Sequence, residues 1–109
     1  MEALRNEISA DLVIELGIKD NAEISALNVK IKNAIREVKN ARNYPSHYTE
    51  EMISKDMEKY YSNIKDVALY DYNQMGAEGQ ISHSENGIGR TWKDRKECFN
   101  GVIPFVHTV

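Results

Sequence analysis

The sequence predicts a mainly α-helical protein: a small bundle of three main helices, then a β-hairpin or loop arm and a short C-terminal helix or extended tail. Two observations predict this fold class. Apolar residues recur three and four positions apart through the first two thirds of the chain, the spacing that lines one face of an α-helix. Beyond Gly76 this periodicity stops and glycines become frequent, which is typical of turns and irregular segments.

The first helix is expected over residues 1–17. Its apolar stripe is narrow and consists of Leu4, Ile8, Leu12 and Leu16. Gly17 follows where a helix usually ends in a left-handed residue, a conformation that glycine adopts without a steric penalty. An isolated helix of this length is marginal in water, so we expect it to dock on the rest of the bundle.

The second helix, over residues 20–43, has the clearest end signals. Asp20 can cap its N-terminus, and Glu23, three residues later, completes a capping-box-like pair. Pro45 disfavours helical backbone at Tyr44 and therefore ends the helix. The apolar seam between these ends consists of Ile24, Leu27, Ile31, Ala34, Val38 and Ala41, with Ile35 broadening it.

The third helix is expected as one element over residues 47–75. One apolar stripe comprises Ile53, Met57, Tyr60, Ile64 and Val67, and a second comprises Tyr61, Ala68 and Tyr72. The segment 67–72 is apolar or aromatic almost all round, and such a helix is usually buried on every side. In so small a protein this indicates contacts with other chains, and it makes Tyr70 and Tyr72 candidate interface residues.

The arm is expected over residues 80–92. Asn86 and Gly87 form the strongest short signal for a hairpin turn, because both positions accept positive φ. The two flanking strands are polar and rich in glycine, so we expect the arm to order against a neighbouring chain. The candidate self or partner interface residues in it are Ile81, Glu85, Asn86, Gly87, Ile88, Arg90 and Trp92.

The tail, residues 93–109, is expected to hold one or two helical turns around positions 94–99. It then continues as an extended apolar segment that a single chain has little core left to bury. Ile103, Phe105 and Val106 therefore complete the predicted interface set.

Composition limits the function classes. The 109 residues fit a single domain, 1–109, and the 14 basic and 17 acidic residues give a net charge of −3. That balance gives no excess of basic residues to bind the phosphate backbone of a nucleic acid. The N-terminal stretch, interrupted by charges every few residues, predicts neither a signal peptide nor a membrane span. The single cysteine, Cys98, belongs to no zinc-binding motif.

Patterns that would support catalysis or a cofactor are weak. Ser82, His83 and Ser84 are consecutive, and consecutive residues of a strand point to opposite faces, so no nucleophile is aligned with a base. The glycines at 87 and 89 lack the third glycine of a dinucleotide fingerprint. His47 and His107 are isolated, without partners at metal-ligand spacing. We therefore expect no enzyme, no metal and no cofactor.

Two alternatives remain open. A small helical nucleic-acid-binding regulator would need a basic recognition helix, and the most basic segment is 30–42, which includes Glu37. Salt-dependent binding of duplex DNA would favour this reading. A minor hydrolase would be supported by turnover that is lost on His83→Ala.

A resemblance to a known family rests on the order of these features. Leu16-Gly17-Ile18 ends a short helix, a capped long helix ends near Asn43-Tyr44-Pro45, and a tyrosine-rich helix leads to the junction Gly76-Ala77-Glu78-Gly79. Ser82-His83-Ser84-Glu85-Asn86-Gly87 and the aromatic Trp92 follow. This sequence resembles the head–tail connector proteins (adaptor or head-completion proteins, often labelled DNA-packaging proteins) of long-tailed bacteriophages and prophages. It departs from them in its tail, where residues 100–105 replace a long closing helix.

The resemblance implies a virion structural protein located at the head–tail interface and assembled in the bacterial host cytoplasm. Its copies would form a ring beneath the portal vertex, with the dodecameric symmetry of the portal. The implied partners are other copies of the chain, the portal protein, and a stopper or tail-completion protein. DNA would pass through the channel without specific binding, and no membrane is implied.

Overall fold

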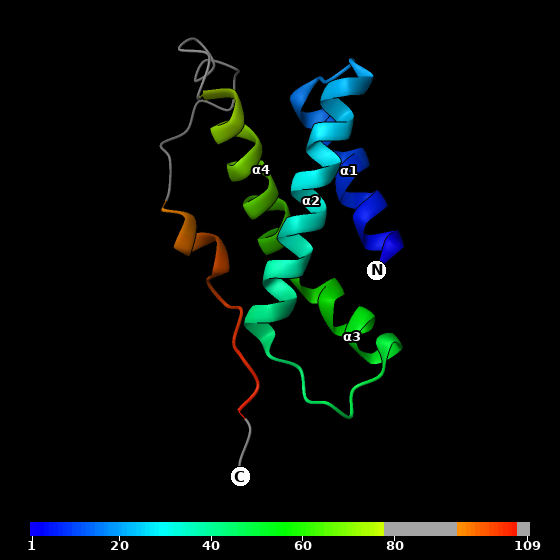
Figure 1. Cartoon of the computed structure of the whole chain (residues 1–109), viewed down its shortest axis with the longest axis vertical. Coiled ribbons are helices and arrows are strands. Elements are labelled where there is room, and N and C mark those ends of the chain that lie inside the picture. Colours follow the sequence, from blue (N-terminus) through cyan, green and yellow to red (C-terminus); the bar gives the residue numbers. More distant parts are fainter. Residues whose placement is uncertain (78–93, 107–109) are drawn as a thin grey trace.

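The computed structural model describes residues 1–77 and 94–106, which form an elongated helical bundle (Figure 1). Four α-helices occur among them: α1 (Glu2–Leu16), α2 (Asn21–Arg42), α3 (Glu50–Met57) and α4 (Tyr61–Ala77). Two 3-10 segments, η1 (Glu58–Tyr60) and η3 (Arg95–Phe99), complete the regular structure of these residues. The mainly helical class is confirmed. These described residues contain no strand, and the β-hairpin arm expected over 80–92 lies outside them.

Helix α1 ends in a Schellman motif. Gly17 adopts a left-handed conformation with φ of 67°. Its N–H bonds to the Ile14 carbonyl at 3.2 Å, and the Ile18 N–H bonds to the Val13 carbonyl at 3.1 Å. These two bonds satisfy carbonyl groups that have no partner within the helix. The chain then turns sharply, so that α1 and α2 lie side by side (Figure 1).

Helix α2 begins and ends at polar caps. The Asp20 carboxylate accepts a hydrogen bond from the Ala22 N–H at 3.0 Å, which confirms the predicted N-cap. Glu23, expected to complete a capping box, accepts a hydrogen bond from the Tyr72 hydroxyl at 3.2 Å. This bond ties the start of α2 to α4. At the other end, Asn43 adopts a left-handed conformation with φ of 54°.

The prediction of one continuous third helix is wrong. The Thr49 hydroxyl caps α3 by accepting a hydrogen bond from the Met52 N–H at 3.1 Å, and η1 then separates α3 from α4. A 3-10 turn winds more tightly than an α-helix, so the chain changes direction there. The spacing of apolar residues along the sequence nevertheless continues unchanged across the turn. Met57 before the turn and Ile64 after it are both fully buried, which explains why the periodicity gives no sign of the break.

The core lies around α2, which packs against α4 on one side and α1 on the other. Val67, Ala68 and Tyr72 are buried within the chain, with η3 covering α4 from outside. The expectation that other chains must cover the segment 67–72 is therefore wrong for these three side chains. These side chains are enclosed because α2, η3 and α1 all pack against α4.

No helix among the described residues combines the length and the apolar character needed to cross a membrane. The molecule measures 51 × 26 × 18 Å along its principal axes, and the tail leaves it at one end of the long axis (Figure 1).

Candidate assembly surface at the C-terminal tail

The tail, here residues 101–106, lies across the C-terminal end of α2. Its backbone is fixed there by a hydrogen bond from the Phe105 N–H to the Arg42 carbonyl at 2.7 Å. The side-chain amide of Asn43 donates a second, longer bond to the Phe105 carbonyl at 3.4 Å. An extended segment with no strand partner has unpaired backbone groups, and the end of α2 provides partners for some of them.

Arg42 is the centre of this contact. Its guanidinium donates through Nη1 to the Ile103 carbonyl, and its Cζ lies 4.2 Å from the centroid of the Phe105 ring. On its other side, Nε and Nη2 are each 3.0 Å from Asp56 Oδ2 on α3. The planar guanidinium therefore links the tail to α3, because its N–H groups form hydrogen bonds while its flat face lies against the Phe105 ring.

Asp56 joins three elements through one carboxylate. Its Oδ2 atom accepts a hydrogen bond from the Tyr44 hydroxyl at 2.6 Å in addition to those from Arg42. Burial alone would raise the pKa of Asp56, but hydrogen bonds from Tyr44 and Arg42 and the charge of Arg42 outweigh it and lower the pKa below its usual value. Burial and the bond to Asp56 raise the pKa of Tyr44. The group is thus a charged carboxylate held between a cation and a neutral phenol.

Aromatic rings from the loop between α2 and α3 form the seat for Phe105. The Phe105 ring centroid lies 5.6 Å from that of Tyr44 and 5.2 Å from that of Tyr48. These separations and their tilted planes are within the favourable range for aromatic pairs. We call this set, consisting of Arg42, Tyr44, Tyr48 and Asp56, the tail seat.

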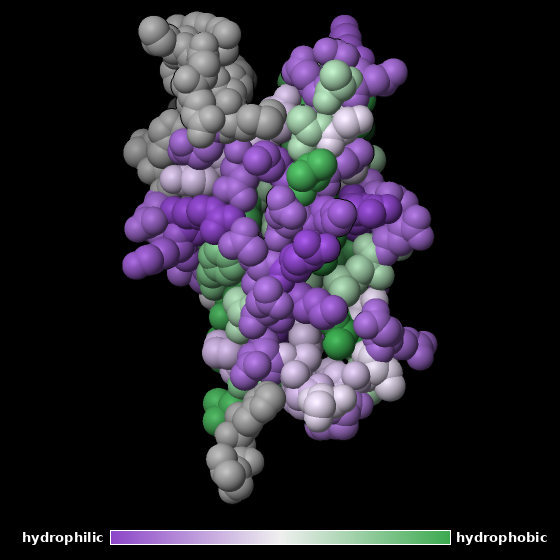
Figure 2. All heavy atoms as spheres, in the orientation of Figure 1, coloured by the Kyte–Doolittle hydropathy of each residue, from purple (hydrophilic) through white to green (hydrophobic). Residues whose placement is uncertain are grey.

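The opposite side of the tail faces outward. Ile103 is 66% exposed and Val106 is 85% exposed, whereas Phe105 between them is half-buried in the tail seat. Figure 2 shows hydrophobic atoms at this tip, next to the C-terminal residues drawn in grey. Two exposed aliphatic side chains on one short segment give a partner an apolar contact that the chain itself leaves uncovered.

A second contact fixes the chain before the tail. Arg95, at the start of η3, donates to both carboxylate oxygens of Glu37 on α2 at 2.9 and 2.5 Å. It also donates to both oxygens of Asp71 on α4, at 2.8 Å each. The bonds to Asp71 and then Glu37 raise the pKa of Arg95, so the guanidinium stays charged. We call this arrangement the Arg95 clasp.

The structure separates the predicted interface residues into three groups. Ile103 and Val106 are exposed as expected, and Phe105 is directed into the tail seat of its own chain. Tyr70 is half-buried against the core, and Tyr72 is only 7% exposed, so Tyr72 offers little surface to a partner. The other predicted residues, Ile81, Glu85, Asn86, Gly87, Ile88, Arg90 and Trp92, lie outside the described part of the chain.

Sequence reasoning missed the residues that position the tail. From spacing alone, Arg42 falls in the last turn of the predicted second helix, Tyr44 directly before Pro45, and Tyr48 within the predicted third helix. One signal was available: an arginine, two tyrosines and a histidine lie within seven positions around Pro45, an unusual density of ring and cation partners for a surface turn. Their partner, Phe105, is distant in sequence and could not be identified from spacing.

The remaining candidate chemical groups are the metal-ligating side chains, Cys98 and the histidines. In residues 1–77 and 94–106 no group of three or more His, Cys, Asp or Glu side chains is placed to hold a metal ion. Cys98 is buried, and His47 contacts the edge of the Tyr48 ring, with centroids 5.2 Å apart. Ser82, His83 and Ser84, for which no catalytic alignment is expected, lie outside these residues.

Comparison with known proteins identifies the family. No curated protein matches the chain, and no solved structure matches it. A family model described as phage gp6-like head-tail connector protein matches residues 10–101, which include all of α2, α3, α4 and η3. The match covers most of the sequence, including the tail seat and the Arg95 clasp. The chain therefore belongs to the family of phage gp6-like head-tail connector proteins.

Proposed function

We propose that this protein forms a ring of identical copies between the phage portal and the stopper or tail-completion protein. The ring extends the DNA channel and completes the head after packaging. Family membership supports a structural role in joining head and tail. The observation that carries the finer proposal is the tail, which is fixed to its own subunit along one side while Ile103 and Val106 face outward on the other.

A tail of this kind suits docking to a partner. Binding costs less when the contact segment is already ordered, because less conformational freedom is lost. The bonds of Arg42 to the backbone of the tail hold its outward side chains in a defined orientation. The apolar surface involved is small, so the tail supplies one contact within a larger set that includes the proposed interface of residues 80–92.

The channel itself requires no attachment to DNA. The chain has a net charge of −3, and carboxylates repel phosphate groups. A ring of mildly acidic subunits therefore lets DNA pass without binding it in one place. No observation in the described residues favours a catalytic function.

Site-specific photo-cross-linking in intact phage particles tests this proposal. A photoreactive residue at Val106 is expected to link the protein to the portal or to the stopper or tail-completion protein. The matched control is the same residue at Asn21, which is exposed at the start of α2, the end of that helix opposite Arg42 and the tail. Particles in which the protein is absent from the head–tail junction, or in which Val106 links to no other structural protein, would refute the proposal.

A further inference from the structure

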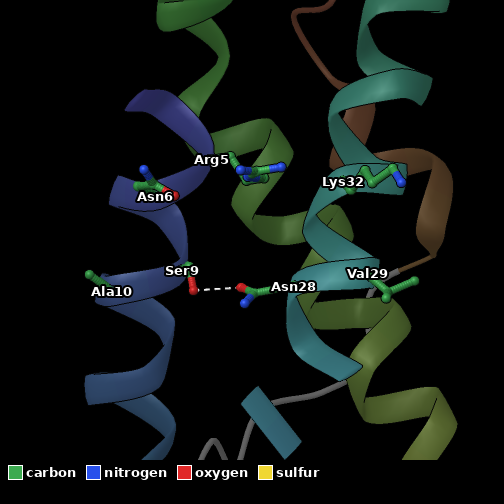
Figure 3. A pocket seen from close by; sticks show the side chains of 7 residues that line it. All are labelled: Arg5, Asn6, Ser9, Ala10, Asn28, Val29 and Lys32. Atoms are coloured by element: carbon green, nitrogen blue, oxygen red, sulfur yellow. Dashed lines mark hydrogen bonds between the residues drawn. The ribbon is translucent and has the colours of Figure 1, made fainter. Parts of the chain in front are cut away.

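The two sides of α1 differ in charge. On the side facing α2, a shallow groove is lined by Arg5 and Ser9 of α1 and by Asn28, Val29 and Lys32 of α2. Figure 3 shows Arg5 extending from α1 towards α2, with a hydrogen bond from the Ser9 hydroxyl to Asn28 Oδ1 (2.6 Å) crossing between the helices. Within the described chain Lys32 is in no ion pair, and Arg5 has only an exposed contact of 3.7 Å with Glu2.

The side of α1 facing η1 and α4 is acidic. Glu7 and Glu58 line a second groove there together with Tyr61, and neither carboxylate forms an ion pair in the described residues. Asp11, one turn beyond Glu7, accepts a hydrogen bond from the Tyr61 hydroxyl. That bond, burial, and the nearby charges of Asp11, Glu7 and Glu15 raise the pKa of Tyr61 to about 12, as a negative environment does.

The helix geometry keeps these surfaces apart within one subunit. Arg5 and Glu7 are two positions apart, and two residues of an α-helix rotate the side-chain direction by roughly 200°. The buried stripe of Leu4, Ile8 and Leu12 lies between the two sides. The basic groove and the acidic side of α1 can therefore meet only if they belong to different copies.

Each surface also has one exposed aliphatic side chain. Val29, which is 54% exposed, lines the basic groove three residues before Lys32. Ile14, which is 78% exposed, follows Glu7 by seven residues, or about two helical turns, so it lies on the acidic side of α1. The basic groove thus has two cationic side chains and one aliphatic side chain. The acidic side has two carboxylates and one aliphatic side chain.

We propose that the basic groove between α1 and α2 of one copy binds the acidic side of α1 of the next copy. The two surfaces are different patches of the same chain, so the contact is heterologous, and repeated contacts of this type close into a ring when the rotation between subunits permits. This inference rests on the proposed ring and specifies the faces that build it. Arg5 and Lys32 lie opposite Glu7 and Glu58, and Val29 and Ile14 supply the apolar contact.

Charge here determines which surfaces meet more than how tightly they bind. Exposed ion pairs contribute little individually, about 0–1 kcal/mol each. Complementary charge nevertheless steers encounter and opposes wrong orientations. Reversal of two charges on one surface replaces attraction by repulsion at every contact of the ring, so the effect on assembly is multiplied by the number of contacts.

Duplex DNA is the other polymer that a basic groove could bind. Arg36 and Lys39 continue the line of Lys32 along α2, four and seven residues further on. The groove is, however, bordered by Glu2, and Glu7 and Glu58 lie on the other side of α1. A second copy pairs both charged surfaces of the chain, whereas DNA in the groove would leave the acidic side without a partner of opposite charge.

Two charge-reversed variants test the contact. R5E/K32E makes the groove acidic, and E7K/E58K makes the acidic side basic, with both changes at exposed or partly exposed positions. Chemical cross-linking of the protein with isolated portal protein is expected to give homo-oligomer ladders for the wild type and at least a fivefold loss for each variant. K19E/K96E, which reverses two exposed lysines elsewhere, is the matched control and should behave as wild type. Circular dichroism checks that all variants remain folded.

Mixing the two variants gives the decisive result. In an alternating ring, the acidic groove of one variant meets the basic side of the other, and the remaining contact pairs a basic groove with an acidic side. We therefore expect an equimolar mixture, and also the quadruple variant, to recover the ladder that each double variant loses. If the double variants lose the oligomer ladder and the mixture does not recover it, the proposed pairing is wrong. It is also wrong if both double variants form the same oligomers as wild type.

The experiments distinguish failure of this subunit contact from failure of the proposed function. If wild-type Val106 cross-links to the portal in particles but the charge reversals leave the oligomer unchanged, the ring is built through other faces and only this inference fails. If the mixture recovers oligomers of a protein that is absent from the head–tail junction, the pairing stands and the proposed function fails. Salt-dependent DNA binding that R5E/K32E abolishes and E7K/E58K retains, together with oligomer ladders that neither variant changes, would overturn the pairing in favour of a nucleic-acid surface.

Discussion

Arg42 holds Phe105 by its backbone and by its side chain at once. The Arg42 carbonyl accepts a hydrogen bond from the Phe105 N–H at 2.7 Å, while the guanidinium lies over the Phe105 ring, 4.2 Å from its centroid. One residue at the end of α2 therefore fixes both the position and the rotation of the tail. The direction in which Ile103 and Val106 face depends on this pair.

Phe105→Ala should release the tail from the tail seat. A half-buried phenylalanine that also contacts a cation contributes about 2 kcal/mol to the free energy of unfolding. We expect a loss of that size in urea denaturation, and faster cleavage of the C-terminus by a protease. Unchanged stability together with unchanged proteolysis would show that Phe105 does not hold the tail.

Ile103→Ser separates docking from stability. Ile103 is two thirds exposed, so its replacement should change the free energy of unfolding by less than about 0.5 kcal/mol. Co-sedimentation with the portal protein should nevertheless weaken, because the partner loses an apolar contact. A variant that unfolds more easily but binds the portal as well as wild type would contradict this assignment of the outward face.

Replacing Arg95 should loosen η3 from the bundle. Arg95→Ala removes bonds to two carboxylates that are partly exposed, and we expect a loss of about 1.5 kcal/mol in urea denaturation. Arg95→Lys keeps the charge but cannot bridge Glu37 and Asp71 in the same planar geometry, so it should recover only part of that loss. Lys96→Ala, at the exposed neighbouring position, is the control and should have no effect.

Asp56 should make the protein sensitive to acid. Because its pKa is lower in the folded chain than in the unfolded chain, its contribution to stability is complete above the ordinary aspartate pKa of about 4 and is lost as the pH falls through the lower folded value. The difference in melting temperature between wild type and Asp56→Asn should be constant between pH 7 and 5 and shrink below pH 4. A difference that grows in acid would have the wrong sign.

Gly17→Ala tests the turn between α1 and α2. Nothing lies within 4 Å of the position that a Cβ atom would occupy, so the penalty comes from the backbone conformation alone. A left-handed residue with a Cβ atom costs roughly 1 kcal/mol. We expect that loss of stability for alanine and a smaller one for Gly17→Asn, since asparagine tolerates this conformation better. Equal effects of the two substitutions would exclude a conformational cause.

The sequence predicts the ends of α1 and α2 well because local chemistry determines them. Asp20 caps its own helix, and Gly17 is followed by the residue whose N–H completes the Schellman motif. The break at 58–60 is different. No proline or glycine marks it, and the tighter turn keeps Met57 and Ile64 in the apolar pattern of a single helix. Only the packing of α3 against the rest of the chain reveals it.

The candidate surfaces required long-range information. Hydropathy identified Ile103 and Val106 because extended apolar residues after a glycine suggest an uncovered segment. It could not separate them from Phe105, whose partners on α2 are about sixty positions away. It also gave too much weight to the segment 67–72, because α4 packs mainly against α2 and is covered further by η3 and α1. The docking of η3 depends on the bonds of Arg95 to two carboxylates that are distant in sequence.

The position of the tail at one tip of a molecule 51 Å long has a mechanical consequence. In the proposed ring, neighbours hold each subunit along α1 and α2, so the subunit would act as a lever with the tail at its end. A slight tilt between neighbours moves Ile103 and Val106 through a much larger arc than it moves the helices. Small adjustments of packing within an assembly would thus widen or narrow the circle on which the tails meet their partner.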